Sequence, residues 1–140
     1  MTICNTTTNS LFNTELASET PMQQAVEIQQ RASSVGFDWP TIAPVMDKIR
    51  EELDEVQQEL TAAEVNPAKV EEEIGDLLFA ALNLVRHVQV EPEQALRSAN
   101  KKFMQRFKSV EAAVQAGSGD FSDYSLEELE AFWQQAKQKR

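Results

Sequence analysis

The sequence predicts an all-α fold, a helical bundle of four to five helices. No run of four to eight residues has the alternating β-branched pattern of a half-buried strand. Four glycines and five prolines are spread through the 140 residues, which leaves room for long uninterrupted helices. The connections between the predicted helices are short, and short connections favour antiparallel neighbours.

Helix boundaries follow from capping residues. Thr20-Pro21 and Asn66-Pro67 each pair an N-cap residue with a proline suited to the first helical position. Ser125 and Glu128 have the spacing of a capping box. Together with apolar periodicity, these signals predict helices over about 20–36, 41–63, 66–88, 92–115 and 125–140.

The first residues differ from the rest of the chain. Residues 1–19 are polar, rich in Thr and Asn, and without sustained periodicity. We therefore predict a flexible N-terminal tail over 1–19 and one helical domain over 20–140. We expect a single copy of this domain, preceded by the short tail alone.

Composition excludes several kinds of protein. Cys4 and His87 are the only residues of their types, which excludes disulfides and structural zinc sites within the chain. The net charge of −10 opposes binding to nucleic acid and to anionic membranes. The sequence has no secretory signal and no apolar stretch long enough to span a bilayer. We expect a cytoplasmic protein that binds neither nucleic acid nor membrane.

The predicted helix over 41–63 has an acidic strip along one edge of its apolar stripe. Glu52 and Glu55 are three residues apart and lie on the same side, and Lys48 precedes them by one turn. Taken alone, this pattern indicates a solvated flank of an amphipathic helix.

The next helix changes that interpretation, because apolar residues cover most of its circumference between residues 70 and 85. We expect its centre to be buried on nearly all sides, yet Glu73 and Asp76 stand there, again three residues apart. Buried unpaired carboxylates are unfavourable and repel one another. A bound Mg²⁺ would remove both penalties, since it prefers oxygen ligands. The sequence therefore predicts a Mg²⁺ site formed by Glu52, Glu55, Glu73 and Asp76.

A di-iron centre is the main alternative metal site in a helical bundle. It needs a Glu-x-x-His step on two helices, whereas the residue three places before His87 is Leu84. We therefore exclude a di-iron site, and we interpret His87 as a helix-end histidine without a catalytic role.

The predicted fourth helix supplies the opposite charge. Lys102 and Arg106 are four residues apart on one face, beside an apolar stripe. Read alone, they are solvated cations. Beside a Mg²⁺ site they would suit phosphate binding, because Arg offers a planar fork of donors and Lys a mobile charge.

These motifs resemble a known family. Glu51-Glu52-Leu53-Asp54-Glu55 followed by Glu73-Ile74-Gly75-Asp76 is similar to the EExxE…ExxD signature of the MazG-like nucleoside triphosphate pyrophosphohydrolases. EExxE alone is common in acidic helices, but ExxD at this distance makes the match specific. The likeness runs from about Met22 to the end and is to the catalytic, C-terminal copy of the two-copy bacterial enzymes. The other matching runs are VGFDWP, VMDKIREELDEV, EEEIGDLLFAALNLVRH, ANKKFMQRF and EAFWQQAK.

The resemblance implies an all-α NTP pyrophosphatase fold that forms a homodimer, with active sites at or near the subunit contact. It assigns the four carboxylates to the metal. It also implies that a set of basic, amide and aromatic side chains contacts the nucleotide: Lys48, Asn83, Asn100, Lys102, Arg106 and Trp133. An alternative role for Trp133 is to dock the last helix onto the bundle. Because the chain carries one copy of the domain, regulation that needs a second copy does not transfer.

The expected reaction is Mg²⁺-dependent hydrolysis of nucleoside triphosphates to the monophosphate and pyrophosphate. Water would attack the α-phosphorus, and Glu52 or Glu55 would orient or deprotonate it. Two alternatives stay open. One is a superfamily enzyme with a narrower substrate, dUTPase-like or a phosphoribosyl-ATP pyrophosphohydrolase. The other is a non-catalytic helical dimer that binds a cation or a protein partner.

Overall fold

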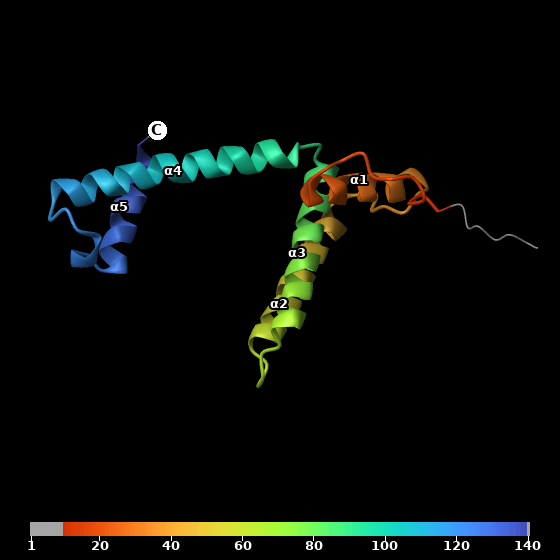
Figure 1. The fold of residues 1–140 in the computed structure, drawn as a ribbon, viewed down its shortest axis with the longest axis horizontal. Coiled ribbons are helices and arrows are strands. Elements are labelled where there is room, and N and C mark those ends of the chain that lie inside the picture. Colours follow the sequence, from red (N-terminus) through yellow and green to blue (C-terminus); the bar gives the residue numbers. More distant parts are fainter. Residues whose placement is uncertain (1–9, 140) are drawn as a thin grey trace, which may run out of the picture. The chain divides into compact units, whose positions relative to one another are not determined.

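The computed structural model describes residues 10–139. Within them the secondary structure is entirely helical (Figure 1), which confirms the all-α prediction. Cys4 and the first half of the predicted tail lie outside the described residues. None of the described helices is long and apolar enough to cross a membrane. The elements are α1 (Pro21–Ser34), α2 (Ile42–Leu60), α3 (Pro67–His87), α4 (Pro92–Ala116), the 3-10 helix η1 (Phe121–Asp123) and α5 (Leu126–Gln138).

Capping side chains set the helix starts as the sequence predicts. The Thr20 hydroxyl accepts the Gln23 N–H at 3.2 Å at the start of α1. Asn66 caps α3 in the same way, through its side-chain oxygen. Ser125 and Glu128 each accept the other's backbone N–H at 3.1 Å, which completes the capping box of α5. These bonds satisfy N–H groups that have no partner within the helix.

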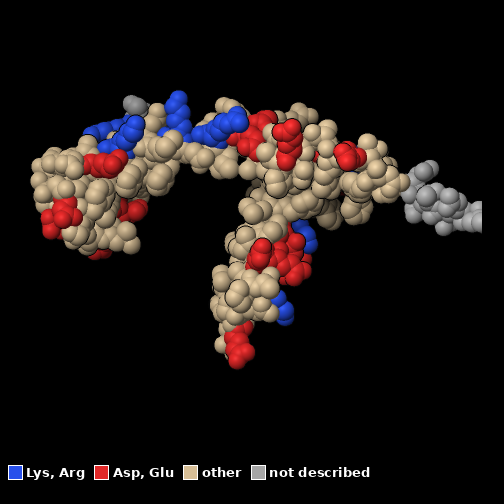
Figure 2. Space-filling view, viewed as in Figure 1, with Lys and Arg blue, Asp and Glu red and all other residues tan. Residues whose placement is uncertain are grey.

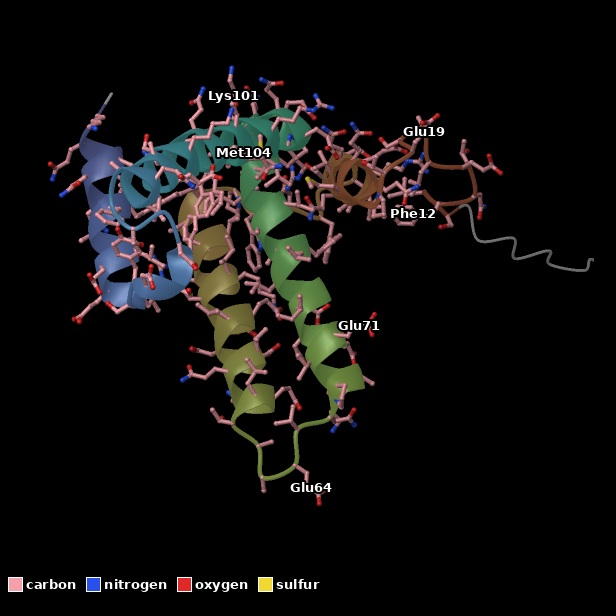
Figure 3. The ribbon with its side chains drawn as sticks, turned by 60° about the vertical axis from the view of Figure 1, so that its left-hand side comes forward. Phe12, Glu19, Glu64, Glu71, Lys101 and Met104 are labelled. Carbon is pink, nitrogen blue, oxygen red and sulfur yellow. The ribbon has the colours of Figure 1, made fainter. Side chains whose placement is uncertain are left out.

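The chain divides into two compact units, residues 1–93 and 94–140, and each is described by itself. In the first unit, α2 and α3 run side by side in opposite directions, and α1 packs on α3 (Figures 1 and 3). The loop that joins α2 to α3 carries Glu64 at its tip (Figure 3). The buried apolar residues of this unit are Ala25, Val45, Val56 and Ala80.

Residues 10–19, here called the N-terminal strap, are bound to α1. The Arg31 guanidinium donates to backbone carbonyls of the strap at 2.8 to 2.9 Å. The Glu27 carboxylate accepts the backbone N–H groups of Ala17 and Ser18 at 3.0 and 2.9 Å, and it also pairs with Arg31 at 2.9 Å. This part of the predicted tail therefore has specific contacts with the helical domain. The predicted boundary between tail and domain at residue 20 stays a prediction.

Most of α3 is less buried than the sequence predicts. Ala80 is its one buried residue, and the Ile74, Leu78 and Phe79 side chains are 38%, 59% and 44% exposed. The expectation that the centre of this helix is buried on nearly all sides is thus wrong for a single chain. The physical reason is that α1 and α2 cover part of its circumference and leave an apolar face open.

The second unit is built on α4, against which η1 and α5 place aromatic rings. The Trp133 and Phe103 ring centroids are 5.0 Å apart, and those of Phe107 and Phe121 are 5.8 Å apart. Val110, Val114 and Ala136 are buried beside them. Aromatic pairs at these distances stabilise helix packing beyond their buried area.

Candidate metal centre and nucleotide-binding residues

Three of the predicted carboxylates lie together between α2 and α3. Glu52 and Glu55 come from α2 and Glu73 from α3, and one oxygen of each lies within 4.8 Å of the others. The antiparallel packing of the two helices brings this group together. Glu71, by contrast, points outward from α3 (Figure 3), so the grouping is specific to one face.

The cluster contains oxygen atoms that lack partners. Oε2 of Glu52 and Oε2 of Glu73 are both buried, and neither has a hydrogen-bond partner among the described residues. The Glu52 side chain is 8% exposed, and its Oε1 pairs with Lys48 Nζ at 3.1 Å. This pairing raises the pKa of Lys48, but Glu52 is the one clustered carboxylate with which Lys48 pairs among the described residues.

Repulsion within the cluster is visible at Glu55. A side-chain hydrogen bond with Glu52, then the charges of Glu52 and Glu73, raise the pKa of Glu55 to about 7. Carboxyl groups this close do not all ionise at neutral pH unless positive charge is added. A divalent cation supplies that charge and satisfies the two unpartnered oxygens, and it takes carboxylate ligands readily. These three residues therefore fit a metal ion.

Asp76, the fourth predicted ligand, does not belong to this group. Its side chain is exposed, and it is not one of the three clustered residues. The three-residue spacing from Glu73 does not by itself exclude Asp76, because Glu52 and Glu55 have the same spacing on α2 and both belong to the cluster. Its role as a ligand stays a prediction.

The predicted nucleotide contacts fall in both units. Lys48 and Asn83 are half-buried in the first unit; Asn100 and Lys102 are exposed and Arg106 is half-buried on α4. Figure 2 shows Lys and Arg side chains gathered along α4. Neither Lys102 nor Arg106 forms an ion pair within the described part of the chain, which leaves both able to bind an anion.

Trp133 is half-buried and packs against Phe103, which is itself 57% exposed. This contact is what the docking role requires. It leaves part of the indole accessible, so a contact with a nucleotide is compatible with the same position.

The structure also contains a cluster that sequence reasoning missed. Asp38, in the turn after α1, accepts hydrogen bonds from Arg86 Nη2 at 2.6 Å and Nη1 at 3.0 Å. His87 Nε2 lies 2.9 Å from the same carboxylate, which agrees with its interpretation as a helix-end histidine. The guanidinium of Arg86 and the other donors hold the pKa of Asp38 well below its usual range. The run VGFDWP was the available sequence signal. It indicates a turn, but it does not show that Asp38 binds Arg86, which lies 48 residues further along the chain.

An all-α chain with three facing carboxylates on antiparallel helices belongs to the class of helical proteins that can hold a metal ion in a bundle. Comparison with known proteins gives the family. The MazG nucleotide pyrophosphohydrolase domain matches residues 41–111, which include α2, α3 and most of α4. The chain belongs to this family.

Individual relatives agree with this assignment. The chain is 48% identical over 118 residues to the nucleoside triphosphate pyrophosphohydrolase of Escherichia coli K12, covering 84% of this chain and 45% of that protein. It is 40% identical over 116 residues to the nucleoside triphosphate pyrophosphohydrolase/pyrophosphatase MazG of Thermotoga maritima, covering 83% and 44%. The chain thus spans less than half the length of these curated relatives.

Proposed function

We propose that this chain hydrolyses nucleoside triphosphates, ribo- and deoxyribonucleotides alike, to the monophosphate and pyrophosphate, and that it needs Mg²⁺. The observation that carries the proposal is the cluster of Glu52, Glu55 and Glu73, with two buried oxygens lacking partners. It lies within the part of the chain that matches the pyrophosphohydrolase domain. The names of the E. coli and T. maritima relatives describe this activity.

The three clustered carboxylates, with Asp76 as the proposed fourth ligand, would hold the metal. A bound Mg²⁺ supplies positive charge for the phosphate oxygens and lowers the pKa of a coordinated water. Without such charge the cluster repels an incoming triphosphate. The match between donor type and ion supports Mg²⁺ over softer metals, because all four groups are carboxylates.

The remaining steps belong to the protein's own side chains. Glu52 or Glu55 would orient the attacking water or accept its proton, with the α-phosphorus as the centre attacked. Lys48, Lys102 and Arg106 would bind phosphate oxygens and stabilise the charge on departing pyrophosphate. Asn83, Asn100 and Trp133 would position the rest of the nucleotide. The family resemblance supports these assignments.

We also propose a homodimer. Ile74 and Leu78 lie one turn apart on α3 and are 38% and 59% exposed, which leaves an open apolar face. A second copy of the chain would cover it. We expect neither nucleic acid nor membrane as a partner, because the chain carries a net charge of −10.

One assay tests the activity. The common NTPs and dNTPs are incubated with the protein and Mg²⁺, and pyrophosphate is resolved from phosphate. In ¹⁸O water, attack at the α-phosphorus places the label in the monophosphate. Turnover of one substrate alone would favour a narrower enzyme, dUTPase-like or acting on phosphoribosyl-ATP. No pyrophosphate from any substrate would favour the non-catalytic dimer.

A further inference from the structure

The first unit contains a cavity of about 540 Å³ that none of the clustered carboxylates lines. Its walls come from α1, the turn that follows it, α3 and the N-terminal strap. A volume of this size is typical of small-molecule sites. Four aromatic rings surround it: Phe12, Phe37, Trp39 and Phe79.

The turn that carries Phe37 and Trp39 is held in place, although both rings face solvent. Phe37 and Trp39 are 81% and 47% exposed. Asp38 between them is fixed by its two bonds from Arg86, by the Ser33 hydroxyl at 2.7 Å and by the Trp39 N–H at 2.8 Å. Gly36 begins this turn at φ 90°, a conformation that favours glycine. The turn is therefore preorganised to present aromatic surface.

Asn83 supplies a hydrogen-bond donor at the cavity. Its side-chain oxygen accepts Arg86 Nε at 3.2 Å and Nη2 at 2.8 Å. Because a guanidinium only donates, the amide oxygen must face Arg86 and the NH₂ group must point the other way. The Asp38–Arg86 pair thereby orients the Asn83 amide.

Gln29 supplies an acceptor. This residue is 6% exposed and lines the cavity, and its Nε2 donates to the Phe79 carbonyl at 2.9 Å. Reversing the amide would place two oxygens against each other, so Oε1 is correctly assigned as the other atom. Oε1 is buried and has no hydrogen-bond partner among the described residues. A buried acceptor without a partner is costly unless a ligand satisfies it.

We propose that this cavity binds the base of the nucleotide. Aromatic walls with one amide donor and one amide acceptor suit a flat heterocycle that carries both an N–H group and a ring or carbonyl acceptor. The inference rests on the proposed function. Phe79 and Asn83 follow Glu73 on α3 by six and ten residues, about 9 and 15 Å along the helix axis, which is comparable with the length of a nucleoside monophosphate. Trp133 is then not the surface on which the base stacks.

The first experiment fills the cavity. Ala32 lines it, whereas Ser34 is exposed near the end of the same helix and does not. Ala32→Phe is compared with Ser34→Phe as the matched control. Adenosine, guanosine, cytidine and uridine are titrated without metal, while the NMR signals of the Gln29 and Asn83 amides and of the Trp39 indole are followed. KM and kcat are then measured with NTPs and Mg²⁺.

We expect nucleosides to shift these three signals in the unmodified protein and in Ser34→Phe. In Ala32→Phe we expect nucleoside affinity to fall, and KM to rise, about tenfold or more, with kcat changed by less than about twofold. Asn83→Asp keeps the acceptor for Arg86 and removes the NH₂ donor. It should weaken nucleoside binding about tenfold, which tests the proposal if Ala32→Phe fails to fold.

Several results would overturn the proposal. Nucleosides could leave the three signals unchanged at millimolar concentration, or KM could rise in Trp133→Ala and not in Ala32→Phe. Loss of nucleoside binding with an unchanged KM would show a site for free nucleosides and not for the substrate's base. If the unmodified protein releases no pyrophosphate, the proposed function fails, whereas the metal-free titration still decides whether the cavity binds nucleosides.

Discussion

The two units of the chain differ in charge. Residues 1–93 contain 17 Asp and Glu but five Lys and Arg, whereas residues 94–140 contain eight Lys and Arg and six Asp and Glu. The net charge of −10 therefore describes the first unit and not the second. An excess of negative charge suits a unit that binds a cation, and an excess of positive charge suits a unit that binds an anion.

The units also differ in how their charges are paired. In the first, Arg31, Lys48, Arg50 and Arg86 all form ion pairs with carboxylates. No Lys or Arg in the described part of the second unit forms one. Arg31 and Arg86 therefore hold segments of the first unit together, Lys48 lies at the carboxylate cluster, and the basic groups of α4 remain for a ligand. The following predictions test this division.

The largest effect is expected at the carboxylate cluster. Glu73→Gln keeps the size of the side chain but removes a charged ligand, so activity should fall to about one-hundredth or less. Circular dichroism should show an intact helical fold. Asp76→Asn should cause a similar loss if the exposed Asp76 is the fourth ligand. Near-normal turnover of Glu73→Gln at saturating Mg²⁺ would contradict the metal site.

The second-largest effect is expected when a basic side chain of α4 is removed. We expect Lys102→Ala or Arg106→Ala to lower kcat/KM about 100-fold, because each removes a donor to charged phosphate oxygens. Lys101→Ala is the matched control, since Lys101 also points outward from α4 (Figure 3). Equal effects of Lys101→Ala and Lys102→Ala would indicate general electrostatics and not a specific contact.

Trp133→Ala separates two roles of one side chain. If Trp133 contacts the nucleotide, KM should rise about tenfold with little change in the melting temperature. If its packing on Phe103 at 5.0 Å serves to dock α5, the melting temperature should fall instead while KM stays close to normal. Steady-state kinetics and thermal denaturation of the same preparation distinguish these outcomes.

Assembly into a homodimer should double the mass of the protein measured in solution. Light scattering at micromolar concentration should give a dimer of the 15.8 kDa chain, because the apolar face of α3 is then covered. Leu78→Glu, at a side chain 59% exposed in the single chain, should shift the equilibrium toward monomer. A monomeric unmodified protein would contradict the proposed dimer.

The smallest effect concerns pH. The pKa of Glu55 is raised from 4.5 to about 7, so between these values the folded state binds more protons than the unfolded state. Without metal, stability should therefore decrease as pH rises through this range. Glu55→Gln should flatten the slope, and saturating Mg²⁺ should also flatten it, because the folded state then keeps Glu55 ionised. Urea denaturation across the range, with and without Mg²⁺, measures this.

Most of the helical structure could be predicted from short-range signals. Thr20, Asn66 and Ser125 cap the helices that the sequence assigns to them, because a cap depends on residues two or three places along the chain. The end of α2 at Leu60 differs from the predicted 63, since helix ends carry weaker signals. The family resemblance was likewise readable from spacing alone and agrees with the domain match over residues 41–111.

The candidate site was predictable in composition but not in full arrangement. The sequence by itself determined that Glu52 and Glu55 share one face of α2, because helical periodicity sets that relation. The packing of α3 against α2 adds Glu73 to them. The tertiary structure alone decided that Asp76 stands apart and that the strap binds α1. It also decided that Gln29 meets the Phe79 carbonyl 50 residues away. Such contacts depend on how the helices pack. A short stretch of sequence does not identify a partner tens of residues away, because the interaction with that partner forms only in the folded chain.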